Sequence, residues 1–475
     1  MPIKTGDRHQ LALLPSSIED YVGTEDRVRA YDAFIDYAVE AGINLPRDTD
    51  MGRPLYDPKT MLKLLAYSYS YGVRSSRQIE RSCHHNLSFI WLTGGLKPDH
   101  KTIASFRRRH TALLKDILKQ CVRFCLKSGL IDGNVLFLDG TKIRANAGLH
   151  NSWTPERCRK VLERMDQKIE ALLAECEAAD QSEEGQTDHV RLSSDLKESA
   201  ALREQVRKIH QELKNEDRSC HNTTDPDCAT MKSRQGVHAA YNVQQSVDDK
   251  HGLIVHTDVV SQATDIRQFA DQVEKIEQAL PKPPVTVCAD AGYACTEEIK
   301  KPLEKGIDVV VPSNAQAAET IPGPFHHDAF SYNLSTDTYL CPEGQTLEYS
   351  GVDKPGISRA YGVPDPLTCR ACRHFGVCTS SPRGRKIKRL IDEDVKKRVE
   401  ARYASPEGQA IYRRRKERAE LPFGFIKRAL KADSFLLRGR QGVLAEASLW
   451  AASFNLTRLI TLLGGVRPLV EKFQT

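Results

Sequence analysis

The stretch Asn134–Ala147 reads NVLFLDGTKIRANA, and it decides the expected fold. Four apolar residues, Val135–Leu138, lead directly into Asp139 and Gly140. A short, continuously apolar run that ends at a turn signal is typical of a strand buried on both faces of a sheet. Because a buried charge without a partner is costly, we expect a cation, a donor or water beside Asp139. An Asp that only opens a turn with Gly140 is the alternative interpretation.

A second stretch repeats this pattern. VTVCADAGY places Asp290 directly after an apolar strand and before a glycine. Connections in a mixed α/β sheet usually bring such strand ends into one region. Two carboxylates there suit Mg²⁺, which prefers oxygen ligands. Two such ions can activate the attacking oxygen and stabilise the leaving oxygen at a phosphodiester.

That arrangement usually includes a third carboxylate. The candidate is Glu420 in YRRRKERAELPFGFIKR, a segment that we expect to form a helix interrupted at Pro422. A single Glu among arginines is more often one half of a solvated ion pair, so this position gains weight only from the two aspartates.

Composition and charge narrow the class of protein. A chain of 475 residues can bury the cores of two or three domains. Its formal net charge is +6, but Arg383–Arg418 alone carries 14 Lys and Arg against 6 Asp and Glu. A concentrated basic patch indicates a polyanion partner, although a charged helix on a solvated face would have a similar composition. We expect this run to guide DNA towards Glu420.

The sequence also indicates a compartment. The segment MPIKTGDRHQLALLP, residues 1–15, lacks the apolar core of a signal peptide, and no run approaches the length of a membrane span. Thirteen cysteines, an odd number without an export signal, favour a reducing cytoplasm over a disulfide framework. We therefore expect a soluble cytoplasmic protein without membrane contact.

Short helices joined by tight turns are expected between Tyr56 and His110. Asp57 is a good N-cap, and Pro58 suits the first helical position. The last of these helices, TIASFRRRH, ends in three arginines that we expect to contact DNA as part of a helix-turn-helix-like reader. These arginines are Arg107, Arg108 and Arg109. A plain helical bundle with a solvated basic end is an equal alternative.

Two heptad-like runs, Glu156–Cys176 and Leu202–Leu213, flank the polar segment DQSEEGQTDH. This pattern predicts an antiparallel helical hairpin with a loop at its tip, inserted between two strands as a structural or oligomerising arm. The sheet is expected to resume with Ala239–Val247 and Leu253–Val260, joined by a hairpin signal.

Strand–helix–strand units should follow the hairpin strands, between Asp265 and Val311. A helix is expected to open at Asp265, and a strand should precede Asp290. The predicted fold class is therefore α/β, a mixed sheet with flanking helices after an all-α N-terminal region.

A cluster of cysteines lies between Asp290 and Glu420. The pattern begins at Cys341 and continues as Cys369-x₂-Cys372-x₅-Cys378, which places four thiols in fewer than 40 residues. A structural zinc site with four Cys ligands is the favoured interpretation. Four reduced cysteines in a loop-rich insertion are the alternative, and His374 leaves the ligand count open.

Taken together, the sequence resembles bacterial insertion-sequence transposases of the DDE class. The resemblance rests on FLDGTKI around Asp139, ADAGY around Asp290, and the order Tyr412, Arg415, Glu420 and Lys427. It also covers YDPKTMLKLLAYSYSYG, GGLKPDHKTIASFR and TDPDCATMKS, and so extends from about residue 56 to about residue 452. The separate motifs are short, and their joint order is the specific signal.

The resemblance implies a ribonuclease-H-like core and a domain plan. Residues 1–130 would form a helical DNA-binding domain, and residues 131–475 would form the catalytic domain. A helical hairpin, residues 153–218, and a Cys-rich segment, residues 320–400, would be insertions. Asp139, Asp290 and Glu420 would hold Mg²⁺ or Mn²⁺ as two ions.

The resemblance also implies contacts with DNA phosphates near the cleaved end. These residues would be Tyr412, Arg414, Arg415, Lys416 and Lys427. The usual signature has three residues between Arg and Glu, whereas four separate Arg415 from Glu420 here. Lys416 is therefore an alternative to Arg415, and Glu417 is a weaker rival to Glu420.

The implied activity is cleavage at the ends of a mobile element, followed by joining of the freed 3′-hydroxyl to target DNA. The partners would be double-stranded DNA, as terminal inverted repeats and as target, with a homodimer on DNA as a hypothesis and a bacterial, nucleoid-associated location. A metal-dependent nuclease without strand transfer is one alternative. A catalytically inactive DNA-binding regulator is the other.

Overall fold

The computed structural model describes residues 17–46, 56–181, 188–215, 220–233, 236–319, 323–354 and 356–475. The chain divides into two compact units. The first contains the described parts of residues 1–264, with 278–281 and 416–475, and the second contains those of 265–277 and 282–415. The N-terminal segment 1–15 and the tip of the predicted helical hairpin, residues 182–187, lie outside the described residues.

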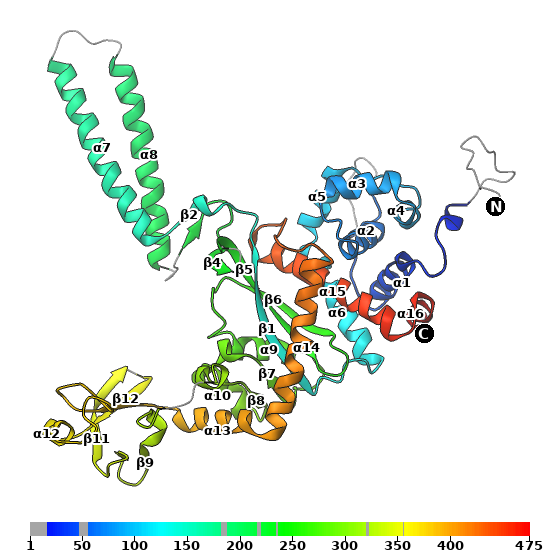
Figure 1. Ribbon diagram of the computed structural model, residues 1–475. Helices are drawn as coiled ribbons and strands as arrows, with labels where there is room; N and C mark the ends of the chain where they lie inside the picture. The colour runs from blue at the N-terminus through cyan, green and yellow to red at the C-terminus, as the bar shows by residue number, and fades with distance from the viewer. Residues whose placement is uncertain are drawn as a thin grey trace, which may run out of the picture. The chain divides into compact units, whose positions relative to one another are not determined.

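Six helices form the N-terminal part of the first unit (Figure 1). Asp57 caps the second of them as predicted, because its carboxylate accepts a hydrogen bond from the Thr60 amide at 2.9 Å, with Pro58 at the first helical position. After the short 3₁₀ helix η1 (Ile18–Tyr21), the helices are α1 (Arg27–Glu40), α2 (Pro58–Ser70), α3 (Ser76–His85), α4 (Leu87–Leu92), α5 (His100–Arg109) and α6 (Thr111–Lys127).

Two C-terminal helices complete this helical part. α15 (Gly439–Leu462) packs against α2, α6 and strand β6 (Ile254–Val260), and α16 (Val466–Phe473) packs against α1 (Figure 1). Glu446 of α15 is completely buried, and its carboxylate accepts hydrogen bonds from the Tyr69 hydroxyl at 2.7 Å and from the Leu436 and Leu437 amides. These bonds satisfy a charge that would otherwise oppose burial.

The described helices differ in length and in apolar character. No single helix among them is long and apolar enough to cross a membrane. α15 and α16 meet the length and composition limits only as a pair, with a bend of 110° between them.

The sheet of the first unit is centred on strand β5 (Gly236–Asp248). β5 pairs in antiparallel fashion with β1 (Val135–Arg144), β4 (Ala229–Ser233) and β6 (Ile254–Val260). Leu136, Phe137 and Leu138 are at most 1% exposed, as expected for a strand covered on both faces. The predicted hairpin between β5 and β6 is also confirmed.

The predicted end of β1 at Asp139 is wrong. The strand continues through Gly140 to Arg144, and Asp139 lies opposite Gln245 in the middle of the pairing with β5. The longer partner strand explains the difference, because β5 supplies backbone hydrogen bonds beyond the Asp-Gly step and the following Thr141 and Ile143 suit a pleated strand. Asp139 therefore belongs to a rigid strand and does not open a turn.

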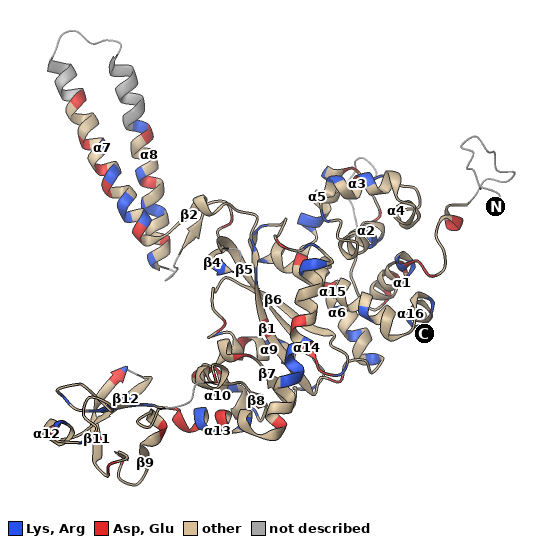
Figure 2. Ribbon diagram, viewed as in Figure 1, with Lys and Arg blue, Asp and Glu red and all other residues tan. Residues whose placement is uncertain are grey.

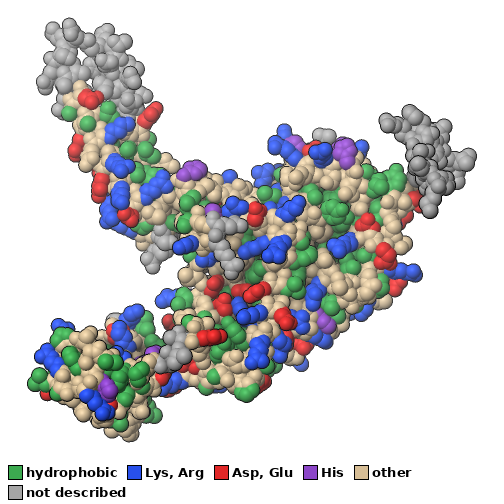
Figure 3. Space-filling view, viewed as in Figure 1, with side chains coloured by type: hydrophobic (Ala, Val, Ile, Leu, Met, Phe, Trp, Pro, Cys, Tyr) green, Lys and Arg blue, Asp and Glu red, His purple; other side chains and the backbone are tan. Residues whose placement is uncertain are grey.

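The predicted helical hairpin is confirmed. α7 (Pro155–Gln181) and α8 (Asp188–Asn215) pack side by side, and two short antiparallel strands, β2 (Ser152–Trp153) and β3 (His221–Asn222), join their bases after η2 (Leu149–Asn151) (Figure 1). Its basal core consists of Cys158, Val206, Ile209 and Leu213. Acidic and basic residues are mixed along the described part of the hairpin (Figure 2), and side chains of both signs appear on its visible face (Figure 3).

The second unit contains a parallel strand pair, β7 (Thr286–Cys288) and β8 (Asp308–Val310). The helix α10 (Thr296–Glu304) connects them, so the predicted strand–helix–strand unit is confirmed. The preceding helix α9 (Phe269–Ala279) begins four residues after Asp265, where a turn replaces the predicted first helical turn. Three further elements, η3 (Ala291–Tyr293), α11 (Asn314–Ala317) and η4 (His327–Ala329), lie in the segments around β8.

A second sheet forms the Cys-rich part of this unit. Its strand order is β13-β12-β11-β10-β9, and all pairs are antiparallel. The strands are β9 (Ser331–Asn333), β10 (Thr338–Leu340), β11 (Thr346–Lys354), β12 (Ser358–Gly362) and β13 (Lys386–Leu390), with the short helix α12 (Pro366–Arg370) before β13. Helix α13 (Glu393–Ala404) follows and is fixed to β8 by Arg402, whose Nη2 lies 2.8 Å from Asp308 Oδ2.

Asp248 at the end of β5 gives a testable pH dependence. Its carboxylate is buried and accepts hydrogen bonds from the Gly133 and Lys250 amides at 2.9 and 3.0 Å, and burial raises its pKa to about 6. Because the folded pKa lies above the unfolded value, the folded state binds this proton more tightly. The contribution to stability is fully present below about pH 4 and is lost as the pH rises to about 6.

We expect wild-type stability to fall relative to Asp248→Asn by about 2 kcal/mol between pH 4 and pH 7, because the variant lacks the titrating group. Urea unfolding at several pH values measures this difference. Parallel stability curves for the two proteins would show that Asp248 does not titrate in this range.

Candidate active site

Asp139 shares one face of the first sheet with two polar side chains. Residues directly opposite each other in an antiparallel sheet point to the same face, which puts Gln245 of β5 and Thr257 of β6 beside Asp139. Asp139 is partly exposed, and its Oδ1 accepts a hydrogen bond from the Gly140 amide at 2.9 Å. The carboxylate therefore lies on the same face of the sheet as Gln245 and Thr257.

Gln245 has an unused acceptor next to this carboxylate. Its side chain is 2% exposed, and its Nε2 lies 3.5 Å from Thr257 Oγ1. Among the described residues, Gln245 Oε1 is buried and has no hydrogen-bond partner. A buried amide oxygen usually has a donor, and a water molecule held by a cation beside Asp139 would be one.

Helix α14 (Pro406–Arg428) contacts the same face of the sheet. Lys427 of α14 donates a hydrogen bond to Thr141 Oγ1. Thr141 follows Asp139 by two residues in β1, so both side chains lie on one face of the strand. The contact places the C-terminal end of α14 over the strand that carries Asp139.

The predicted interruption of this helix at Pro422 is wrong. α14 is continuous through Pro422, although a proline there removes the hydrogen bond to the carbonyl of Arg418. Ala419, Phe423 and Ile426 are buried on one side of the helix and hold it in place. Packing of this apolar side compensates for the missing bond.

The opposite side of α14 is exposed and carries three charged residues in register. Lys416, Glu420 and Lys427 are all exposed. At 3.6 residues per turn, Glu420 is rotated from Lys427 by about 20° and Glu417 by about 80°. Glu420 is therefore better aligned than Glu417 with the side chain that reaches β1. Lys416 precedes Glu420 by one turn, as the usual signature requires of its basic residue.

Asp290 lies just after β7 and caps η3. Its Oδ1 accepts a hydrogen bond from the Gly292 amide at 2.8 Å, and its Oδ2 lies 3.2 Å from Arg415 Nη2. The Asp290 side chain is 40% exposed, whereas that of Arg415 is 8% exposed. Arg415 thus holds the carboxylate in position from the protein side. It does not present its guanidinium to the surface, as a phosphate contact would require.

A further acid near Asp290 was not identified from the sequence. A side chain at Gly292 would place its Cβ 2.9 Å from Asp290 Oδ1 and 3.8 Å from Asp265 Oδ2. Both carboxylates therefore lie close to Gly292, where an added Cβ would crowd Asp290. The sequence gives a weaker signal for Asp265 than for Asp290, because four residues separate Asp265 from the end of strand β6.

The three arginines of α5 differ in their surroundings. Arg107 is 6% exposed and donates to the Tyr69 hydroxyl and to the Arg74 carbonyl at 3.1 and 2.8 Å. This correction follows from helical periodicity, since one of three consecutive residues must face the core. Arg108 and Arg109 are exposed, and Figure 2 shows basic residues on α3 and α5. Arg108 also lines a surface depression of about 500 Å³ with Arg77 and Lys101.

Much of the basic run Arg383–Arg418 is engaged within the second unit. Arg389 is 8% exposed, pairs with Asp394 and lies over the Tyr332 ring at 3.8 Å. Arg402 pairs with Asp308, and Arg415 pairs with Asp290. The composition of the run therefore overstates the charge that it can offer to DNA. Its exposed basic residues include Arg383, Lys386, Lys397, Arg398, Arg413 and Lys416.

The remaining predicted residues are partly exposed. Tyr412 packs edge-on against Tyr403 at a centroid distance of 5.0 Å, and Arg414 is intermediate in exposure. The four cysteines of the predicted zinc site are free thiols of intermediate exposure. Across the described ranges, no three or more His, Cys, Asp or Glu side chains are already gathered closely enough to hold a metal ion.

Two family models match the chain. Residues 16–109 match the model described as "Transposase domain (DUF772)", and residues 340–460 match the model described as "Transposase DDE domain". Among solved structures, the chain is similar to the cryo-EM structure of a piggyBac transposase synaptic complex with hairpin DNA, with 10% identity and a TM-score of 0.36 over 95% of this chain and 79% of that chain. No curated protein matches the chain.

Proposed function

We propose that the chain is a transposase of the DDE class, and that Asp139, Asp290 and Glu420 are the metal-binding carboxylates at which it cuts and joins DNA. Transposases of this class use divalent metal ions, and the proposed ion is Mg²⁺, with Mn²⁺ as a substitute, bound as a pair in a ribonuclease-H-like core. When bound, such ions stabilise both the attacking and the leaving oxygen of an in-line displacement.

The contact between Lys427 and Thr141 carries most of this proposal. It brings the helix of Glu420 to the face of β1 on which Asp139 lies, within one unit of the protein. Asp139 and Glu420 are far apart in sequence, and apolar packing between the helix and the strand would not by itself require an acid at either position. The unused Oε1 of Gln245 on the same face fits a hydrated cation.

Asp290 would join this pair as the third ligand, with Arg415 as its positioning residue. The buried guanidinium fixes one carboxylate oxygen, and the Gly292 amide fixes the other. Both carboxylate oxygens keep further acceptor capacity for a cation. Asp265, beside Gly292, is a candidate for orienting metal-bound water.

We assign the exposed basic residues to different parts of the bound DNA. Lys416 and Lys427 flank Glu420 on one side of α14, so we assign them to phosphates at the cleaved end. Arg108 and Arg109 of α5 would contact phosphates of the terminal inverted repeat. Tyr412 and Arg414 would contribute from the second unit. Arg107 and Arg415 are assigned to internal positions instead.

The proposed reaction uses an oxygen nucleophile at each step. Water would be the nucleophile for cleavage at the element end, and the freed 3′-hydroxyl would be the nucleophile for joining to target DNA. The carboxylates would hold the metal ions, while the lysines hold the phosphate backbone in line. Two ends must be processed, so a homodimer on DNA, acting in the bacterial cytoplasm at the nucleoid, is part of the proposal.

The direct test is incubation of the full chain with Mg²⁺ and a labelled duplex that carries the inverted repeat flanking its coding region. We expect nicked products at the repeat terminus and, with a target duplex added, joined products. Cleavage without joining would favour the nuclease. Binding without either product, at every Mg²⁺ and Mn²⁺ concentration, would favour the inactive DNA-binding regulator.

A further inference from the structure

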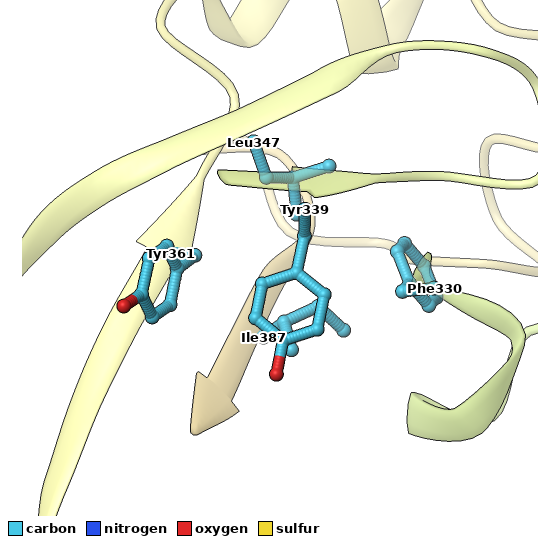
Figure 4. Close-up of a cluster of buried hydrophobic side chains, with 5 residues drawn as sticks. All are labelled: Phe330, Tyr339, Leu347, Tyr361 and Ile387. Atoms are coloured by element: carbon cyan, nitrogen blue, oxygen red, sulfur yellow. The ribbon is translucent and has the colours of Figure 1, made fainter. Parts of the chain in front are cut away.

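The Cys-rich sheet of the second unit has a small hydrophobic core. Its cluster of buried side chains contains Phe330, Tyr339, Leu347, Tyr361 and Ile387, which point toward one another between the strands (Figure 4). A core of this size rarely stabilises a segment of about 70 residues without a disulfide or a metal ion. The sheet therefore needs a further source of stability.

Four thiols surround one cavity next to this core. Cys341, Cys369, Cys372 and Cys378 all line a space of about 30 Å³, and the rest of its lining is divided evenly between apolar and polar residues. The space is small, which suits a single ion. Cys341 and Cys378 also pack directly against the core cluster.

Two backbone amides point at sulfur atoms of this set. The Gln345 amide donates to Cys341 Sγ at 3.2 Å, and the Arg385 amide donates to Cys369 Sγ at 3.4 Å. These contacts fix the positions of the two sulfurs beside the cavity. At Gly384, a Cβ would lie 2.7 Å from Val363 and 3.2 Å from Cys369 Sγ, so this close backbone approach requires glycine.

The two cysteine-bearing turns are joined by a polar contact that does not involve the sulfur atoms. Glu343, in the turn after Cys341, lies 3.0 Å from Arg373 Nη2 and 3.1 Å from His374 Nε2. His374 is therefore already engaged by a carboxylate, and its ring also packs against Phe325. This arrangement assigns His374 to the support of the site and leaves four cysteines as ligands.

We propose that Cys341, Cys369, Cys372 and Cys378 bind one structural Zn²⁺ in the cavity between the two turns. Four thiolates satisfy the tetrahedral coordination of structural zinc, and binding releases their protons. Because the thiols are not yet gathered at ligand distance, their side chains must rotate about χ1 toward the cavity centre. The ion would link the 341–344 turn to the 369–378 loop and stabilise the sheet, independently of the DNA chemistry.

The test measures zinc in the full chain, purified without chelator and with a thiol reductant. We expect about one zinc per chain by elemental analysis. Cys369→Ser and Cys378→Ser should lower bound zinc at least about tenfold, since each removes a ligand. Cys295→Ser is the matched control, because Cys295 is also a free thiol of intermediate exposure in the second unit. His374→Ala should keep its zinc.

A second measurement uses only the wild-type chain, so it does not depend on the folding of any variant. Wild-type chain reconstituted with Co²⁺ should show the visible absorption of tetrahedral cobalt bound to thiolates, and Zn²⁺ should displace it. Wild-type protein without zinc and without this absorption would overturn the proposal, as would two disulfides among the four cysteines in mass spectra taken without reductant. Loss of zinc in His374→Ala together with full zinc in Cys369→Ser would overturn the ligand set.

Discussion

Replacement of Asp139 by Asn should lower the rate of strand cleavage by about a thousandfold or more, because it removes one metal-binding carboxylate and several kcal/mol of transition-state stabilisation. Binding of the terminal repeat should remain within about threefold of wild type, because phosphate contacts dominate affinity for DNA. Asn keeps the volume of the side chain and can still accept the hydrogen bond from the Gly140 amide. Folding should therefore be preserved.

Single-turnover cleavage of the labelled repeat, with gel-shift binding alongside, measures both quantities. Asp132→Asn is the matched control, since Asp132 is an exposed acid three residues before β1 whose oxygen accepts a hydrogen bond from the Asn134 amide. The control should cleave at the wild-type rate. Cleavage by Asp139→Asn at a normal rate would remove Asp139 from the triad.

The existence of strand β1 could be predicted from the sequence around Asp139, but its end could not. The apolar run before it correctly predicted a buried strand, because four consecutive apolar side chains indicate burial on both faces of a sheet. The end of that strand was not predictable from the same residues. It depends on β5, which pairs with β1 as far as Arg144 and lies about 100 residues further along the chain.

The charged residues show a second limit. Composition identifies Arg107 and Arg415 as basic, but their roles follow from the direction in which each side chain leaves its helix. Arg107 meets Tyr69, and Arg415 meets Asp290, so both act inside the protein. Partners distant in sequence cannot be read from local pattern. The same reason hid Asp265, whose position relative to Asp290 depends on the fold around Gly292.

The N-terminal helices could be predicted from the sequence, but the helix that packs against them could not. Its first helices were predicted from caps and turns, and the Asp57 cap is present. The sequence did not indicate that α15, from the opposite end of the chain, completes their core through the buried Glu446. An apolar helix is compatible with many neighbours, so its partner is decided by tertiary packing.

The third carboxylate is the position that most needs experiment, because Glu420 and Glu417 lie one turn apart on α14. Glu420→Gln should lower cleavage by about a thousandfold, as for Asp139, while Glu417→Gln should stay within about threefold of wild type. The two substitutions remove the same charge from the same exposed helix, so they are matched in their effect on DNA binding and on folding.

The expected difference comes from geometry. Lys427 reaches Thr141 from α14, and Glu420 is rotated from Lys427 by about 20°, whereas Glu417 is rotated by about 80°. Glu420 therefore leaves the helix in nearly the same direction as Lys427, and Glu417 does not. Single-turnover cleavage of both variants, measured at saturating Mg²⁺, distinguishes the two acids. A severe defect in Glu417→Gln with near-normal cleavage by Glu420→Gln would reassign the third ligand, and it would also make Lys416 an unsuitable partner for the signature.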